Sequence, residues 1–138
     1  MTKTASEIAE VLYQYLTSST LAGAVSGTVY HAGLRPRDSK VEDITIAYSA
    51  GTTGEVQTSI FYINIYVPDI DPWGNGVYVE NKSRTAVLER LAGDFADWLS
   101  CRDGYLFRLY GQIHTSPVDG TGQHSIVLPL QIDYWTNY

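Results

Sequence analysis

Three histidines, His31, His114 and His124, are the side chains best suited to general-base chemistry or metal ligation at neutral pH. None lies at a familiar metal-ligand spacing from another histidine or from the single cysteine, Cys101. His114 and His124 flank one predicted hairpin, across which they could face each other. The simpler interpretation is that both are exposed at strand ends. The histidines therefore do not define a site on their own.

Two carboxylates, Asp69 and Asp71, stand at i and i+2, a spacing that calcium or magnesium sites sometimes use. The other ligands of an EF-hand loop are absent. No G-x-S-x-G elbow surrounds a serine, no base neighbours Cys101 in the sequence, and neither G-x-G-x-x-G nor a P-loop occurs. We therefore expect no catalytic residue, no metal and no cofactor. An enzyme, such as a small hydrolase or a metal-dependent enzyme, is the least favoured class.

Composition has two interpretations, a surface rich in interface residues or a chain rich in strands. Only 17% of the 138 residues are charged, whereas the chain has 11 tyrosines and 3 tryptophans. Tyr and Trp are enriched and Lys and Glu depleted at protein interfaces, although a strand-rich chain also favours Tyr. A net charge of −6 argues against a nucleic-acid-binding domain but not against DNA passing nearby without being gripped.

The single cysteine cannot form an internal disulfide, and the first residues lack the apolar run of a signal peptide. No apolar stretch approaches the roughly 20 residues that span a bilayer. We expect a soluble chain made in a reducing cytoplasm, with no membrane partner.

Two amphipathic helices are predicted, over residues 5–16 and 83–99. Thr4 and Glu7 form a capping box before the first helix, and apolar residues follow at helical spacing. A shorter helical turn is predicted within 21–25. Strands are predicted over 28–31, 44–48, 56–68, 105–114 and 125–135. Turns or loops are expected at 49–54, 69–82 and 115–123, and Pro129 indicates an edge strand, a bulge or an amide that points away from its neighbour.

The order of these elements predicts an α+β fold, in which a mostly antiparallel sheet carries two amphipathic helices packed on one face. No repeat or linker divides the chain, so we expect a single domain, 1–138. The strand over 56–68 is long enough that it should project beyond its sheet or bend at a bulge.

That strand has two different sides. Phe61, Ile63, Ile65 and Val67 form an apolar stripe that suits a core, while Ile60, Tyr62, Asn64 and Tyr66 alternate with them on the other side. Two helices cover only one side, so nothing in the subunit should cover the second. We predict that it is a subunit or partner interface. The charged connector 33–43 is either a solvated loop or an arm that reaches a neighbouring subunit or a partner, and Trp73 in the 69–82 loop is either tucked over the core or presented to a partner. The complete set of predicted interface residues is Arg35, Arg37, Lys40, Ile60, Tyr62, Tyr66, Trp73, Tyr110 and Trp135.

Taken in order, these features resemble the small tail-terminator (tail-completion) proteins of long-tailed bacteriophages. The first helix has the L-x-x-x-L form at 12–16. A leucine followed by small residues lies at 21–25, G-x-V-Y at 27–30, and a proline at Pro36. A charged loop, a hairpin containing VQTSIFYINIYV, a helix reading TAVLERLAGDFADWLS and a closing hairpin then follow in the same order.

The resemblance implies a virion protein, assembled in the host cytoplasm, that forms a hexameric ring at the tail or neck. Such a ring caps the completed tail tube and joins it to the head connector, while DNA passes through its lumen. The implied partners are other copies of the chain, the tail-tube protein and the head-tail connector proteins. Alternatives are a neck or head-completion ring and a non-viral interaction module, such as an adaptor or a subunit of a contractile secretion apparatus.

Overall fold

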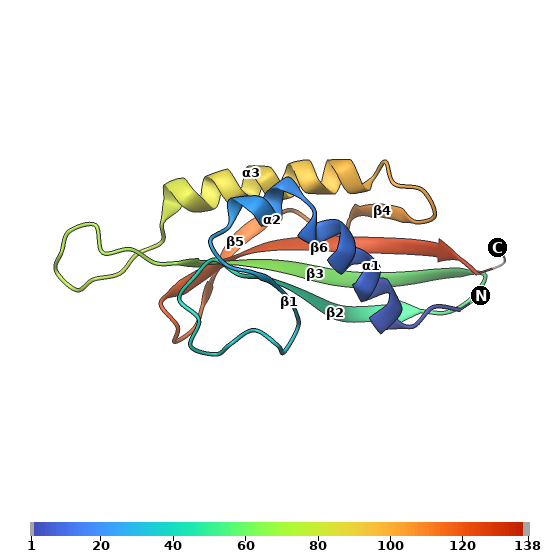
Figure 1. The fold of residues 1–138 in the computed structure, drawn as a ribbon, viewed down its shortest axis with the longest axis horizontal. Helices are drawn as coiled ribbons and strands as arrows, with labels where there is room; N and C mark the ends of the chain where they lie inside the picture. The colour runs from blue at the N-terminus through green and yellow to red at the C-terminus, as the bar shows by residue number, and fades with distance from the viewer. Residues whose placement is uncertain (1, 137–138) are drawn as a thin grey trace.

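The computed structural model describes residues 2–136. The predicted single domain, 1–138, extends past this range by Met1 and residues 137–138, which lie outside the described part. Figure 1 shows helices packed on an open sheet, with both ends of the chain near the same end of the molecule. The elements in chain order are α1 (Ala5–Thr17), α2 (Thr20–Ala24), β1 (Val29–His31), β2 (Ile44–Thr52), β3 (Val56–Pro68), α3 (Lys82–Leu99), β4 (Leu106–Leu109), β5 (His114–Val118) and β6 (Gln123–Trp135).

The sheet has six strands in the order β1-β2-β3-β6-β4, and β5 also pairs with β6. Among the strand pairs of residues 2–136, β1–β2 alone is parallel; β2–β3, β3–β6, β4–β6 and β5–β6 are antiparallel. The predicted α+β fold with a mostly antiparallel sheet is confirmed. The two central strands, β3 and β6, pair along their whole length, from Val56 opposite Trp135 to Pro68 opposite Gln123.

Local signals explain where the two long helices begin. In the capping box that precedes α1, the Thr4 hydroxyl accepts the Glu7 amide at 3.2 Å, and the Glu7 carboxylate accepts the Thr4 amide at 3.0 Å. Asn81 caps α3 by accepting the Arg84 amide at 3.4 Å. Both predicted helices are confirmed to within one residue at each end, as is the strand over 56–68.

The core lies between the helices and one face of the sheet. Alternate residues of β3, including Phe61, Ile63 and Ile65, are fully buried, as are the apolar residues of α1, α3 and β6 that face them. The intervening residues of β3 are half-buried. The predicted assignment of sides is therefore confirmed, and we call the side of the sheet away from the core the second face.

The prediction of one strand over 105–114 followed by a loop over 115–123 is wrong. Two short strands, β4 and β5, pair in turn with β6, and residues 110–113 separate them. Pro129 explains the break. Its carbonyl accepts the Tyr110 amide at 3.0 Å, and a strand residue directs its carbonyl and its nitrogen to the same neighbour. The nitrogen of Pro129, which has no hydrogen, therefore faces the gap between β4 and β5.

The first hairpin also differs from its prediction. β2 continues to Thr52 instead of ending at Tyr48, so most of the predicted turn 49–54 is strand. A register shift between Tyr48 and Ala50 marks a bulge in β2. The expectation that the long strand β3 projects beyond the sheet or bends at a bulge is wrong, because β6 pairs with β3 throughout and the bulge lies in β2.

Candidate interaction surfaces

One end of the second face is covered by the chain itself. The connector 33–43 folds back so that the Arg35 guanidinium lies 4.0 Å from the centre of the Tyr66 ring. Arg35 Nε also donates to Asp43 Oδ2 at 3.0 Å, and Arg35 Nη1 donates to Gln123 Oε1 at 3.3 Å. The expectation that nothing within the subunit covers Tyr66 is therefore wrong. Its interface role, like that of Arg35, stays a prediction.

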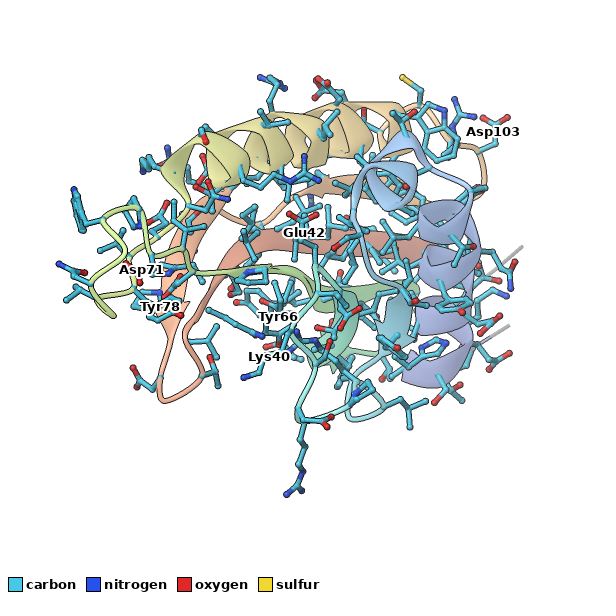
Figure 2. All side chains as sticks on the ribbon, turned by 60° about the vertical axis from the view of Figure 1, so that its left-hand side comes forward. Lys40, Glu42, Tyr66, Asp71, Tyr78 and Asp103 are labelled. Carbon is cyan, nitrogen blue, oxygen red and sulfur yellow. The ribbon has the colours of Figure 1, made fainter. Side chains whose placement is uncertain are left out.

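The two other connector cations, Arg37 and Lys40, are exposed. Figure 2 shows Lys40 and Tyr66 in the same region of the molecule, where the connector passes the sheet. Nothing in the described part of the chain fixes a role for either cation, so the prediction that they contact a partner stands untested.

The opposite end of the second face, near the chain termini, is more open. Val56 and Trp135 are cross-strand neighbours there, and both are exposed, as is Leu106 on β4. Ile60 and Tyr62 are half-buried, and Tyr110, directly after β4, is exposed. We call this group the open end; its apolar and aromatic residues are Val56, Ile60, Tyr62, Leu106, Tyr110 and Trp135. Val56 and Leu106 are not among the predicted interface residues. Alternation within β3 is enough to place Val56 on the second face, whereas Leu106 can be placed there only once the register of β4 on β6 is known.

A hydrogen-bonded polar group lies within the open end. Asp133 is buried; it accepts the Thr58 hydroxyl at 2.9 Å and the Gln131 amide at 3.2 Å, and it pairs with Arg108 Nη2 at 3.0 Å. The Asp133 carboxylate already accepts hydrogen bonds from its own chain. An interface could therefore bury it completely without supplying a hydrogen-bond donor. Aromatic and aliphatic side chains around a satisfied polar group are typical of a protein interface.

A second polar cluster ties the connector to α3. Glu42 receives two hydrogen bonds from Arg84, at 2.7 and 2.8 Å, and Arg84 also donates to the Ala24 carbonyl. The neighbouring Asp43 accepts the Thr28 amide at 3.0 Å. A Cβ on Gly27 would lie 2.1 Å from the Asp43 carboxylate, so only glycine fits there. Figure 2 shows Glu42 beneath the helices, in the interior of the molecule.

These contacts keep both carboxylates charged. The hydrogen bonds from Arg84 lower the pKa of Glu42, although burial opposes ionisation. Burial also tends to raise the pKa of Asp43, but hydrogen bonds from Ser39, Thr28 and Arg35 outweigh it and lower that pKa. This cluster was not identified from the sequence, because its members are far apart in the chain. Arg84 is 42 positions from Glu42, and Thr28 is 15 positions from Asp43.

The loop 69–82 forms an arm that projects from the end of the sheet (Figure 1). Of the two alternatives for Trp73, the structure has the exposed one, because its side chain is 67% exposed. The two carboxylates considered for a cation face different partners. Asp69 Oδ1 lies 2.6 Å from His124 Nδ1, whereas Asp71 accepts the amides of Asn75 and Gly76.

The three histidines do not converge. His114 pairs with Val127 and His124 with Pro117, so the two lie at opposite ends of the β5–β6 pair, and His31 contacts Glu10 on α1. Within residues 2–136, no group of three or more His, Cys, Asp and Glu residues is arranged to hold a metal ion. Over the same range, no helix combines the length and apolar character that crossing a bilayer requires.

The structure also has an apolar groove between α2 and α3 that sequence reasoning did not identify. Its volume is about 380 Å³. The wall residue Trp98 is partly exposed and packs edge-on against Tyr15, with ring centres 5.4 Å apart. The guanidinium of Arg102 covers this indole at 4.2 Å. The groove is lined by Ser18, Ser19, Thr20, Leu21, Leu91, Asp94, Phe95 and Trp98.

Comparison with known proteins adds no family to this description: no protein-family model matches the chain, and no curated protein matches it in sequence. The fold and its surfaces define the class of protein as an α+β chain with one covered and one partly open sheet face.

Proposed function

We propose that this chain is a structural virion protein, a phage tail terminator that assembles into a ring, caps the tail tube and joins it to the head connector. The observation that carries the proposal is the open end of the second face. Exposed Trp135 and Leu106 lie there beside half-buried Ile60 and Tyr62 on a sheet whose other face is fully used by the helices. Apolar and aromatic side chains that surround an internally hydrogen-bonded polar group, here that of Asp133, are typical of association sites.

The charge distribution is compatible with DNA passing through a ring without being held. Four arginines, at positions 35, 84, 90 and 108, form ion pairs with acidic side chains of their own chain. Binding to DNA requires cations that are free to replace the counterions of the phosphates. With these guanidiniums paired and a net charge of −6, a ring of such chains would give DNA little to adhere to if the exposed Arg37 and Lys40 face a neighbouring subunit, as predicted, and not the lumen. The resemblance of the sequence supplies the tail position, with the tube protein and the connector as neighbours.

The open end gives the first test. The double variant Leu106→Ser/Trp135→Ser removes two exposed apolar side chains, so it should leave the fold intact and abolish assembly. A matched control, Leu34→Ser/Val87→Ser, changes two exposed apolar residues elsewhere and should assemble normally. Light scattering and negative-stain electron microscopy would measure the ring, whose mass should be a multiple of 15.3 kDa. Assembly of the first variant at the concentration that suffices for the unmodified chain would show that this surface is not the interface.

The virion gives the second test. An antibody against the chain should label the head-proximal end of the tail in electron micrographs, and particles made without the chain should have tails of uncontrolled length. Virions that contain none of the chain at the tail or neck would overturn the proposal.

A further inference from the structure

The arm is a preorganised structure. Its turn is closed by the Asp71 carboxylate, which accepts the amides of Asn75 at 3.2 Å and Gly76 at 2.9 Å. The Asn75 side chain accepts the Val77 amide at 3.0 Å. Gly74 and Gly76 have φ values of 66° and 82°, in the left-handed region that favours glycine. A segment fixed in this way loses little conformational freedom when it binds.

The base of the arm is anchored at both ends. Ile70 and Val79 exchange two backbone hydrogen bonds of 2.9 Å. Below them, His124 on β6 lies between the first and last acidic residues of the arm. Its Nδ1 is 2.6 Å from Asp69 and its Nε2 is 3.8 Å from Glu80. The arm is thus held in one direction relative to the sheet.

The side chains that the arm presents are apolar and aromatic. Trp73 is 67% exposed, Tyr78 is 63% exposed, and Val77 is also exposed. The only charged residue between Ile70 and Val79 is Asp71, whose carboxylate is engaged in the turn. The exposed aromatic side chains of this tip resemble the anchor residues at the centres of protein interfaces.

The groove between α2 and α3 has the complementary character. Leu21, Leu91, Phe95 and Trp98 supply its apolar walls, and its one charged residue, Asp94, is paired with Arg90 at 3.2 Å. Its volume of about 380 Å³ lies in the range of pockets that enclose organic groups, so it can accept an aromatic side chain. The Asp71 carboxylate of the arm is held by backbone amides and Asp94 of the groove by Arg90, while the cation beside the groove is Arg102 on the Trp98 ring. Docking therefore sets no two unpaired like charges against each other.

The arm and the groove lie at opposite ends of α3. The arm joins α3 at Lys82, whereas the groove wall residue Trp98 is in the last turn, about 24 Å away (16 residues at 1.5 Å each). Figure 2 shows Asp71 and Tyr78 on one side of the molecule and Asp103, which follows α3, on the other. The arm of a given chain therefore does not fill the groove of that chain.

We propose that the arm of one copy docks in the groove of a second copy, with Trp73 or Tyr78 inserted between Leu91 and Trp98. The inference rests on the proposed ring, since every copy then donates one arm and accepts another. Two different patches at opposite ends of a subunit form a head-to-tail contact, which generates a closed ring when the rotation between neighbours divides the circle. This contact would be additional to the one made by the open end of the second face, which lies on the other side of the sheet from the helices.

Paired cysteines test the contact directly. In a Cys101→Ser background, one preparation carries Val77→Cys on the arm and another carries Thr20→Cys at the groove. Mixed and mildly oxidised, they should give a disulfide-linked product of twice the 15.3 kDa chain mass that contains both variants. The control replaces the groove cysteine by Leu34→Cys, which is also exposed but does not line the groove, and should give at least tenfold less mixed product.

A second variant separates this inference from the ring itself. Trp73→Ser/Tyr78→Ser changes only exposed side chains, so the fold should persist while the concentration needed for assembly rises at least tenfold. If this variant assembles like the unmodified chain and no mixed disulfide forms, the arm does not bind a second copy, whereas the ring proposal stands. Mixed disulfides without rings would support the contact and overturn the ring. If the cysteine variants give no mixed disulfide and the unmodified chain does not assemble, both proposals are overturned.

Discussion

Replacing Arg84 by methionine should destabilise the folded chain more than any other exposed or half-buried charge change on α3. Methionine keeps an unbranched stem of similar length and a good helix propensity, so the change mainly removes the guanidinium. With it go two hydrogen bonds to Glu42 and one to the Ala24 carbonyl. Glu42 is then left as a nearly buried carboxylate without its cation.

The magnitude follows from this geometry. Removing one partner of a buried ion pair costs about 3–5 kcal/mol. Here the Arg84 side chain is 31% exposed and that of Glu42 is 11% exposed. Because water compensates part of the loss, we expect a decrease of about 2–3 kcal/mol in the free energy of unfolding. For a chain of this length, that corresponds to a Tm lower by about 7–10 °C.

The matched control is on the same helix. Arg90 pairs with Asp94 at 3.2 Å, but both side chains are more than 60% exposed. Arg90→Met should therefore cost less than about 0.5 kcal/mol. Chemical denaturation followed by tryptophan fluorescence and circular dichroism would give both values, provided that the slope with denaturant is the same for all variants.

A double-mutant cycle completes the assay. Glu42→Gln and Arg84→Met should each destabilise the chain, and together they should cost at least 1 kcal/mol less than the sum of the two. The reasoning is refuted if the two effects simply add, or if Arg84→Met is no more harmful than Arg90→Met.

Two further results are expected from the same cluster. Gly27→Ala should destabilise the chain by about 2 kcal/mol or more, since its Cβ would overlap the Asp43 carboxylate, whereas Gly23→Ala, with nothing within 4 Å, should be neutral or stabilising in thermal melts. Because the folded chain lowers the pKa of Glu42 and of Asp43, the stability they contribute is complete above their unfolded values, near pH 4, and is lost as the pH falls through the folded ones. The Tm should stay level down to about pH 5 and then fall, and the fall should be shallower in Arg84→Met; a Tm that rises on acidification would contradict this sign.

The helices and the long strands could be predicted from the sequence because their signals are local. The Thr4 capping box, the helical spacing of apolar residues and the alternation in β3 each involve neighbours a few positions apart. The α+β fold and the assignment of core and second faces followed from them. Pro129 was recognised as an exception, although its effect falls on the neighbouring strands β4 and β5.

What could not be predicted depends on contacts between distant segments. Nothing near Glu42 in the sequence indicates that Arg84 will bind it, and nothing near Tyr66 indicates that Arg35 will lie on its ring. For the same reason the predicted interface residues divide into different environments. Arg35 and Tyr66 contact each other, Trp73 lies on the arm, and Trp135 lies at the open end. The groove could not be predicted because it exists only where α2 packs beside α3, and the sequence does not show that these helices are neighbours.

The pairing of β3 with β6 has a consequence for the order in which the molecule can fold. Partners in this pair are far apart along the chain, from Pro68 with Gln123 to Val56 with Trp135. A ribosome takes about 3–13 s to add the 67 residues from Pro68 to Trp135. During that interval β2 can already pair with β3, but the other edge of β3 and its apolar side have no β6 to meet. The centre of the sheet is thus the last part to close, and a nascent chain exposes an unpaired edge and an apolar side of β3 until β6 leaves the ribosome.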